Sequence, residues 1–520
     1  MEGRKGQTMY DRLILSHNLG TTGDKAVVYD EKGNIISSWL SLYRVIYREG
    51  NKVEQDPGDW WRAVCESTKK VMRGINEKSI AVVTFSGQMM GCLCLDKAGD
   101  PIGNAIIWAD MRSDKESKQL LSQIDEKLFF HITGHKISAS YTLSKLLWIM
   151  HNRPEAFAKT SKVVQAKDYI VYKLTGEIVT DYSDASGTNL FNLTKRQWSR
   201  TLTSIIGLNP KILPEAIPST QIAGYVTMDA SVATGLLPGT PVVIGAGDGI
   251  CASLGGGCTT EDDAYLYFGS SAWIGMVKPT PYWEPTMRTF NWSFIQPDQI
   301  APCGTMQAAG ASLDWLKDEL AREEVTQSEL QRSYPQHLIE MLVTQSPPGA
   351  NGLLFLPYLM GERSPYWNPQ ARGAFIGLKR NTRRSDMFRA CYEGVAMNLK
   401  IIWEALKPIN KATELVVIGG QANSDINKHI IADAFNIPVV SHNHLKDSKN
   451  FGAAVIGGLG IGMYESADVV KDLLHYERRI LPNEANVEFY DRYLPLYEQA
   501  YTSLVDFYQN LDQFTNTKES

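Results

Sequence analysis

The chain has 520 residues, of which 43% are hydrophobic, so two or more folded domains are favoured over disorder. Its formal net charge is -5, and Lys and Arg are dispersed, which argues against a basic surface for nucleic acid. The first twenty residues carry charges where a signal peptide needs an apolar stretch, and no apolar run reaches the ~18 residues of a membrane span. We expect a cytoplasmic protein that acts on small molecules, without nucleic-acid or membrane partners.

Apolar stretches near the N-terminus alternate with polar turns. They predict a β-meander, with strands at 13–15, 26–29 and 35–36 and turns at 20–23 and 31–34. The region 263–277 repeats this pattern, because DAYLYF leads through Gly-Ser-Ser at 269–271 into AWIGMV. Two hairpins with Gly-Thr-Thr and Gly-Ser-Ser turns predict two related halves.

Other apolar runs end in glycine-rich turns, at 81–88, 241–249 and 414–424. Such runs are typical of buried strands that bring backbone to a ligand at their carboxyl ends. Helical spacing of apolar residues is present at Asp59–Arg73 and at Asp386–Leu406. The pattern predicts α/β architecture in both halves.

The second hairpin starts a new meander near residue 259, so we place a domain junction there. We expect an N-terminal domain at 10–258, a C-terminal domain at 259–475 and a helical extension at 476–520. The sequence has no low-complexity linker, so the two domains should pack around a cleft.

The cysteines and histidines give no framework for a disulfide or a structural metal. Seven cysteines are scattered along the chain, which suits reduced thiols. Cys92 and Cys94 alternate with Leu93 in an apolar run and are expected in the core. His442 and His444 are expected in a solvated loop, because no cluster of Cys or carboxylate accompanies them.

Standard nucleotide motifs are missing from the sequence. There is no Gly-Lys dipeptide, which excludes a Walker A loop, and neither an H-R-D loop nor a G-x-G-x-x-G fingerprint occurs. Backbone amides and hydroxyls of the two Gly/Ser/Thr hairpins could bind phosphates instead. Taken singly, each hairpin is equally well an ordinary turn.

Together the hairpins, the strand ending at Asp248 and the GGQANS turn resemble the FGGY carbohydrate kinases. The family's two signatures are similar to SYTLSKLLWIMHN at 140–152 and to GAFIGL at 373–378 followed by DMFRACYE at 386–393. Further segments resemble the xylulokinase branch: QDPGDWW at 55–61, SGQMMG at 86–91, IIWADMR at 106–112 and FLPYLMGERSPYWNPQARGAF at 355–375. The resemblance implies two actin-like (ribonuclease H-like) domains flanking a catalytic cleft.

It also implies roles for residues, with ATP and Mg²⁺ as cofactors and a small sugar or polyol as partner. Asp248, between two glycines after an apolar strand, would be the general base that takes the proton of the sugar hydroxyl. Sugar contacts would come from Gln88, Met89, Met90, Trp108, Asp110 and Asp248. Contacts to ATP would come from Gly20, Thr21, Thr22, Lys25, Gly269, Ser270, Ser271, Gly310, Gly420, Gln421 and Asn423. Mg²⁺ would lie near Asn18 and Asp248.

The residues themselves leave other readings open. Asp248 could instead cap a helix that begins near Ile250, because Asp is a favoured N-cap. Asp110 with Arg112 could form a surface ion pair, and Met89 and Trp108 could belong to the core.

The two signatures depart from the family pattern at His151 and Cys391, and three departures concern the expected site. Met90 stands where xylulokinases have His, which removes a hydrogen-bond partner for the sugar. Gln421 replaces a common Gly, and Asn18 replaces the Asp associated with Mg-ATP.

The first hypothesis for function is ATP-dependent phosphorylation of a small ketose or polyol, with a gluconate or tetritol kinase as the nearest alternative. The second is a sugar- and nucleotide-binding sensor with weakened catalysis, which Asn18 favours. The third, an actin-like chaperone or filament protein, would not need SGQMMG or PYLMGERSP. A homodimer is an open option.

Overall fold

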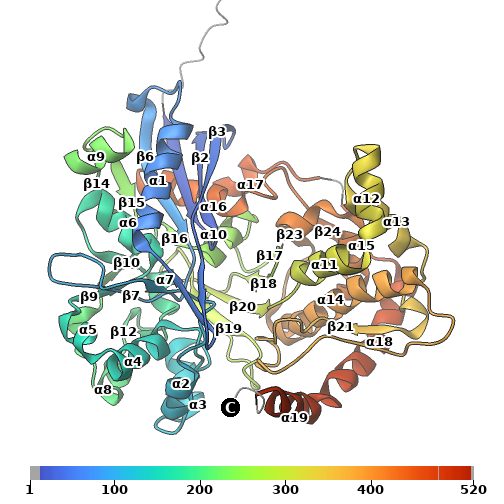
Figure 1. The fold of residues 1–520 in the computed structure, drawn as a ribbon. Coiled ribbons are helices and arrows are strands. Elements are labelled where there is room, and N and C mark those ends of the chain that lie inside the picture. Colours follow the sequence, from blue (N-terminus) through green and yellow to red (C-terminus); the bar gives the residue numbers. More distant parts are fainter. Residues whose placement is uncertain (1–11, 478, 517–520) are drawn as a thin grey trace, which may run out of the picture.

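The computed structural model describes residues 12–477 and 479–516. Two lobes lie side by side, an N-terminal lobe drawn in blue to green and a C-terminal lobe drawn mainly in yellow to red (Figure 1). Each lobe is built on a mixed sheet with helices packed against it, so the α/β fold class is confirmed.

The sheet of the N-terminal lobe has the order β14-β15-β6-β1-β2-β3, with β16 also beside β6. Its strands are β1 (Leu13–Leu19), β2 (Gly23–Asp30), β3 (Ile35–Leu42), β6 (Ile80–Gly87), β14 (Ile222–Tyr225), β15 (Pro241–Val243) and β16 (Ala246–Gly247). The predicted meander is confirmed, but β1 and β2 run further into polar sequence. The extension is stable because buried polar groups pair, as where His17 Nδ1 lies 2.9 Å from Asp24 Oδ2.

The sheet of the C-terminal lobe has the order β19-β20-β18-β17-β23-β24. Its strands are β17 (Ala264–Phe268), β18 (Ala272–Met276), β19 (Phe290–Ser293), β20 (Ile300–Met306), β23 (Leu415–Ile418) and β24 (Val439–Val440). The antiparallel pair β17-β18 with parallel β23 repeats the antiparallel pair β1-β2 with parallel β6. The predicted relation between the two halves is therefore present in the topology.

Helices cover both faces of the N-terminal sheet. One face carries α1 (Pro57–Val71), α6 (Ala166–Thr175) and α9 (Met228–Thr234). The first of these begins two residues before the predicted start, because the Asp56 side chain accepts a hydrogen bond from Gly58 N and Pro57 suits the first turn.

The other face packs on α10 (Asp248–Gly255) and α16 (Ser448–Gly460), which lie between the two sheets (Figure 1). Although 200 residues apart in sequence, the two helices touch through glycines. A Cβ at Gly255 would lie 1.9 Å from Ser448 O, and one at Gly452 would lie 1.9 Å from Cys251 O. Only glycine permits this approach, which brings the start of α16 beside the end of α10.

Smaller elements complete the lobes. The N-terminal lobe adds β4 (Ile46–Arg48), β5 (Lys52–Gln55), β7 (Leu93–Leu95), β8 (Ala105–Ile106), β9 (Lys162–Val164), β10 (Val179–Asp181), β11 (Phe191–Asn192), β12 (Gln197–Trp198), β13 (Glu215–Ile217), α2 (Asp114–Leu121), α3 (Glu126–Thr133), α4 (Thr142–Asn152), α5 (Pro154–Lys159), α7 (Tyr182–Ser186) and α8 (Arg200–Ile205). The C-terminal lobe adds α11 (Gly310–Trp315), α12 (Arg322–Gln331), α13 (Pro335–Thr344), β21 (Leu354–Leu356), β22 (Ala374–Ile376), α14 (Arg384–Leu406), η6 (Gly420–Asn423), α15 (Asp425–Phe435) and α17 (Val469–Leu473).

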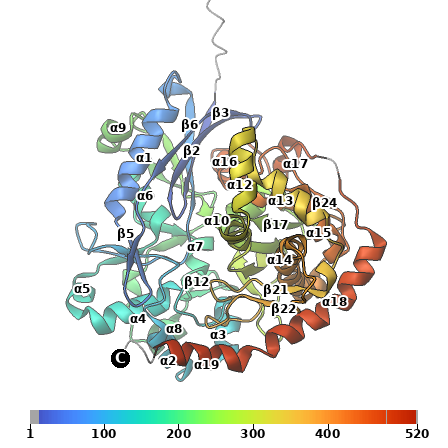
Figure 2. The ribbon, with the colours of Figure 1, turned by 45° about the vertical axis from the view of Figure 1, so that its right-hand side comes forward.

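The end of the described chain forms α18 (Glu484–Thr502) and α19 (Val505–Asn516). These helices run along the lower edge of the C-terminal lobe (Figure 2). Tyr490 and Tyr497 of α18 are fully buried, and the Tyr497 hydroxyl donates to Gly394 O of α14. The expected helical pattern of the last fifty residues is confirmed for this part.

The histidine prediction was wrong. His442 and His444 are 0% and 5% exposed, because they follow the buried strand β24 and His444 stacks on Phe451 with 4.3 Å between ring centroids. Cys92 and Cys94 are buried as predicted. Within residues 12–477 and 479–516, no group of three or more His, Cys, Asp or Glu side chains is placed to hold a metal ion. No helix of the same residues is both long and apolar enough to cross a membrane.

Candidate active site between the two lobes

A cavity of roughly 450 Å³ opens between the lobes. Residues that line it from the N-terminal lobe include Thr21, Thr22, Gln88, Met89, Met90, Trp108, Tyr141 and Asp248. Those from later in the chain include Tyr267, Ser270, Ser271, Trp273, Gln307, Arg363, Trp367 and Lys449. Both predicted hairpins and most of the predicted sugar contacts thus face one space.

Asp248 is the first residue of α10. Its carboxylate caps no backbone amide in the described part of the chain, so the helix-cap reading fails. The carboxylate is 26% exposed, and Oδ2 lies 2.8 Å from Lys449 Nζ. Burial lowers the pKa of Lys449, but the Asp248 carboxylate and Tyr267 outweigh this and raise it above its usual value. A carboxylate and a stable cation therefore face each other at the cavity.

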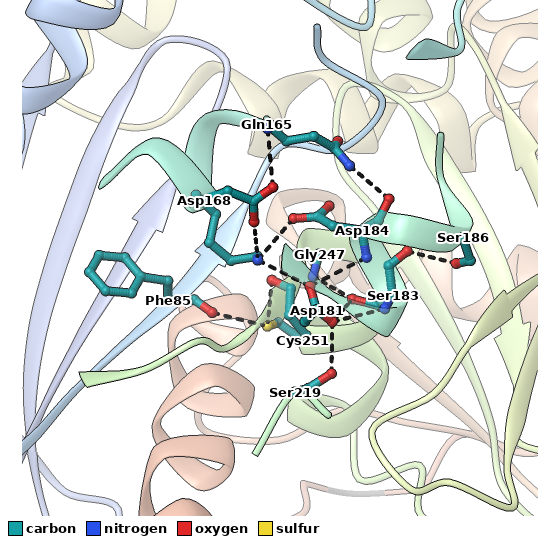
Figure 3. Close-up of polar contacts among 12 residues, drawn as sticks. Phe85, Gln165, Asp168, Asp181, Ser183, Asp184, Ser186, Ser219, Gly247 and Cys251 are labelled. Carbon is teal, nitrogen blue, oxygen red and sulfur yellow. Dashed lines mark hydrogen bonds and ion pairs between the residues drawn. The ribbon is translucent and has the colours of Figure 1, made fainter. Parts of the chain in front are cut away.

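A buried polar network fixes the backbone just before Asp248 (Figure 3). Gly247 N donates to Ser183 Oγ at 2.9 Å, and Ser183 Oγ donates to Asp181 Oδ2 at 2.5 Å. Ser219 Oγ donates to the same Asp181 oxygen at 2.7 Å. The strand end that carries Asp248 is thereby tied to a charged centre in the core.

That centre is Lys167, which is fully buried. Its Nζ lies 2.8, 3.0 and 3.2 Å from carboxylate oxygens of Asp168, Asp181 and Asp184. Burial lowers the pKa of Lys167, but the three carboxylates more than reverse this and raise it well above its usual value. Burial, followed by the neighbouring Asp181 and Asp168, raises the pKa of Asp184 well above its usual value.

The orientation of Gln88 follows from its neighbours. Trp60 Nε1 can only donate, and it donates to Gln55 Oε1 at 3.0 Å. Gln88 Nε2 donates to the same oxygen at 2.7 Å, and Gln55 Nε2 donates to Thr21 O. Gln88 Oε1 is left as a buried acceptor without a partner among the described residues. This oxygen is ready for a hydroxyl donor, and Gln55 links it to the first hairpin.

Two methionines shape the same side of the cavity. Met89 lies against the backbone before Asp248, since a Cβ at Gly247 would be 2.5 Å from its sulfur. Met90 has a left-handed backbone with φ of 64°, an uncommon conformation for a residue with a side chain. Lys145 Nζ donates to Met90 O at 2.8 Å and holds this turn.

Trp108 and Asp110 separate in space. Trp108 lines the cavity, and its Nε1 donates to Thr21 Oγ1 at 3.0 Å. Asp110 lies elsewhere: it is 0% exposed and pairs with Arg112 NH2 at 2.7 Å. Arg112 also pairs with Glu54 at 2.8 Å. The ion pair considered from the sequence exists, but it is buried and not at the surface.

The second hairpin rests on the start of α11. Gly310 N donates to Gly269 O at 2.9 Å, and a Cβ at Gly310 would lie 2.3 Å from that oxygen. The same Cβ would be 3.2 Å from Gln421 Cγ. Gly420 and Asn423 are exposed in η6, where Asn423 Nδ2 donates to Gly420 O at 2.8 Å. Gly269, Gly310 and Gln421 of η6 are thus in contact, with Gly310 buried between the other two.

Lys25 and Asn18 lie on the first hairpin. Lys25 pairs with Asp447 beside the start of α16. Asn18 is near the end of β1, and its Oδ1 is buried without a hydrogen-bond partner in the part of the chain described. An orphaned amide oxygen and the Asp248 carboxylate suit Mg²⁺, which takes oxygen ligands, keeps several waters and is shared with phosphates.

Sequence reasoning missed Arg363 and Lys449. Arg363 lies in the quoted GERSP segment, and its guanidinium is 5.8 Å from the Trp108 ring centroid. Its Nε is buried without a partner among residues 12–477 and 479–516. Lys449 could have been noticed as a lysine in the first turn of a helix, a position that the helix dipole disfavours for cations.

Comparison with known proteins agrees with this geometry. The family models for the N-terminal and C-terminal domains of FGGY carbohydrate kinases match residues 13–255 and 264–461. A gluconokinase of Bacillus licheniformis is 30% identical, with 96% of this chain and 98% of the relative covered. A xylulose kinase of Staphylococcus xylosus is 30% identical over 94% of this chain and 99% of the relative.

Solved structures show the same fold. A ligand-bound xylulose kinase from Lactobacillus acidophilus superposes with a TM-score of 0.90 at 26% identity, covering 96% of this chain and 100% of that one. A gluconate kinase from the same organism also gives 0.90 at 26% identity, covering 96% of this chain and 99% of that one. With both domain models matched and full-length relatives at 30% identity, this chain belongs to the FGGY family of carbohydrate kinases, and its fold is the actin-like ATPase fold.

Proposed function

We propose that the protein transfers the γ-phosphoryl group of ATP to a hydroxyl of a small ketose, polyol or aldonate, with Asp248 as general base. The observation that carries the proposal is the cavity itself, in which the Asp248 carboxylate, the free Gln88 oxygen and both hairpins face one space. Relatives named xylulose kinase and gluconokinase support this substrate range.

Each side of the cavity has a distinct task in this reaction. Gln88 Oε1 accepts a hydrogen bond from an acceptor hydroxyl, while Met89 and Trp108 form the apolar wall that polyol sites need. Asp248 takes the proton of the attacking hydroxyl. We assign Asp110 a supporting role outside the sugar contacts. Its carboxylate pairs with Arg112 and so anchors the segment that carries Trp108.

The hairpins at Gly20–Thr22 and Gly269–Ser271 bind the phosphates through backbone amides and hydroxyls. Gly310 and Gln421 border the second hairpin, and with Gly420 and Asn423 they form the surface for adenosine. Lys25 supports the first hairpin through Asp447. Mg²⁺, bound with ATP near Asn18 and Asp248, would neutralise phosphate charge.

The experiment is a coupled ADP-release assay over pentuloses, hexuloses, tetritols, pentitols and gluconate. We expect one acceptor to stimulate turnover strongly, because closure on the acceptor expels water and assembles the site. Asp248→Asn should lower kcat by about 10²–10⁴-fold and leave ATP affinity nearly unchanged. If ATP binds but no acceptor changes ADP release, the sensor reading replaces the kinase reading.

We also propose the domain division at residues 258 and 475. The boundary at residue 258 is supported by the family models, since the first ends at residue 255 and the second begins at residue 264. A reducing, cytoplasmic setting is supported by the seven free cysteines. The homodimer stays a prediction.

A further inference from the structure

Lys449 stands between the proposed base and the second phosphate hairpin. Its Nζ is 2.8 Å from Asp248 Oδ2, and it lies 4.7 Å from the ring centroid of Tyr267 and 5.2 Å from that of Trp273. These rings face each other across β17 and β18, with centroids 4.0 Å apart. Since β17 and β18 carry the Gly269–Ser271 turn, the ammonium group stands at the root of that hairpin.

The position of Lys449 conflicts with the local preferences of its helix. It occupies the first turn of α16, where aligned backbone dipoles disfavour a cation. It is also only 18% exposed, so it has given up most of its hydration. A lysine that is unfavourable both at this end of a helix and in a poorly hydrated position is expected to have a role in binding or catalysis at the adjacent cavity.

The backbone of α16 is fixed firmly enough to aim the side chain. Asn450 Nδ2 donates to Lys25 O at 2.8 Å, and Ser16 Oγ donates to Asn450 O at 2.8 Å. The next residue after Lys449 is thus tied to both strands of the first hairpin. The stem of Lys449 is held, while its four-carbon chain leaves the ammonium free to change partners.

We propose that Lys449 is a second catalytic residue: it holds the Asp248 carboxylate while the cavity lacks substrates, and in the ternary complex it donates hydrogen bonds to the phosphoryl group in transfer. This inference rests on the proposed function. The exchange is favoured because the triphosphate brings more negative charge than one carboxylate. Asp248, once released, is free to accept a proton.

The step balances without any other reactant. The acceptor hydroxyl gives its proton to a carboxylate oxygen of Asp248, and the hydroxyl oxygen forms a bond to the γ-phosphorus. The bond from that phosphorus to the bridging oxygen breaks, and its electron pair leaves with ADP. Lys449 keeps all its protons and stabilises the charge that develops on the transferring group and on the leaving oxygen.

The test compares Lys449→Met with Lys471→Met. Lys471 is a matched control, because its Nζ also pairs with an aspartate at 2.8 Å, to Asp263, on another part of the C-terminal lobe. With the acceptor found by the ADP-release assay, Lys449→Met should lower kcat by about 10²–10³-fold, the usual effect of removing one donor to a developing charge. Lys471→Met should stay close to wild type, and Lys449→Arg should recover part of the loss.

A binding measurement separates a role toward phosphate from mere positioning of Asp248. ADP, aluminium fluoride and the acceptor together mimic the state in which the phosphoryl group is in transfer. The affinity of Lys449→Met for this combination should fall by the same factor as kcat, while its affinity for ADP alone should hardly change. The same weakening should persist in an Asp248→Asn background. If Lys449→Met turns over normally, or has no effect on the mimic when Asp248 is already Asn, the inference is wrong.

These outcomes differ from failure of the proposed function. In that case Asp248→Asn would turn over like wild type, or no acceptor would be phosphorylated by any variant.

Discussion

Lys167 gives the sharpest test of how the fold supports Asp248. We consider Lys167→Met, which keeps an unbranched side chain one atom shorter and removes its charge. The ammonium is fully buried and within 3.2 Å of three carboxylates, so its loss leaves negative charges in the core without a cation. Removing one partner of a buried ion pair usually costs about 3–5 kcal/mol, and we expect a loss of unfolding free energy in that range.

One compensation limits the loss. The pKa of Asp184 is already raised by burial and by its carboxylate neighbours, so Asp184 should take up a proton when the lysine is gone. For this reason the double variant Lys167→Met with Asp184→Asn should be no less stable than Lys167→Met alone. Turnover should also fall in the single variant, because Asp181 and Ser183 no longer fix Gly247 N.

Urea unfolding followed by tryptophan fluorescence, with tryptophans in both lobes, would measure the free energy of unfolding of each variant. Lys400→Met is the control: Lys400 is 2% exposed, but its partner Asp491 is 58% exposed and can stay hydrated. Lys400→Met should therefore lose less unfolding free energy than Lys167→Met. A loss below about 1 kcal/mol for Lys167→Met would show that the carboxylates are not charged in the wild type, and the reasoning would fail.

Three further predictions address the cavity and the core. Met90→His should raise kcat/KM for xylulose relative to other acceptors, because an imidazole can hydrogen-bond a sugar hydroxyl; an unchanged ranking would place Met90 outside the sugar contacts. Asn18→Asp should lower the Mg²⁺ concentration that gives half-maximal rate, since a carboxylate holds metal-bound water better than an amide; superimposable Mg²⁺ titrations would remove Asn18 from the metal site. Acid should destabilise the fold, because burial lowers the pKa of His135 and of His442 from 6.5 to about 3. Between pH 6.5 and about pH 3 the unfolded chain binds two more protons than the folded chain, one on each histidine. The stability that the two neutral histidines contribute is complete above pH 6.5 and falls by up to about 2.7 kcal/mol per pH unit as the pH drops. The double variant His135→Gln with His442→Gln should show a smaller pH slope when urea titrations are repeated at several pH values.

The sequence predicted the parts of the fold that depend on short-range pattern. Strand, turn and strand at 13–36 and at 263–277 were readable because apolar alternation and small polar turns are local signals. The start of α1 was placed two residues late, since the cap at Asp56 was not used. The relation between the halves followed from two similar hairpins, and the topology repeats it.

Other features depend on partners far away in sequence. The predicted exposure of His442 and His444 failed because distant rings cover them: Tyr476 packs edge-on against His442 and Phe451 stacks on His444, and a loop composition does not show this. The sequence suggested that Asp110 lies in the cavity or in a surface ion pair. Asp110 is instead buried with Arg112, and Arg112 also pairs with Glu54, which is distant in sequence. Lys449 lies 201 residues from Asp248, and nothing in the spacing of the two residues signals their contact.

Several of the local preferences that this chain breaks concern the elements around the cavity. Met90 has a left-handed backbone, Lys449 stands at the wrong end of a helix, and the amide oxygens of Gln88 and Asn18 lack partners in the described structure. Each feature costs stability in the free protein, by about 1–3 kcal/mol for a strained backbone or an unpaired buried polar group. A hydroxyl, a phosphate and a hydrated Mg²⁺ would relieve the cost at Gln88, Lys449 and Asn18. Bound substrates should therefore stabilise the closed protein more than their contact area alone implies, because they satisfy groups that the fold leaves unsatisfied.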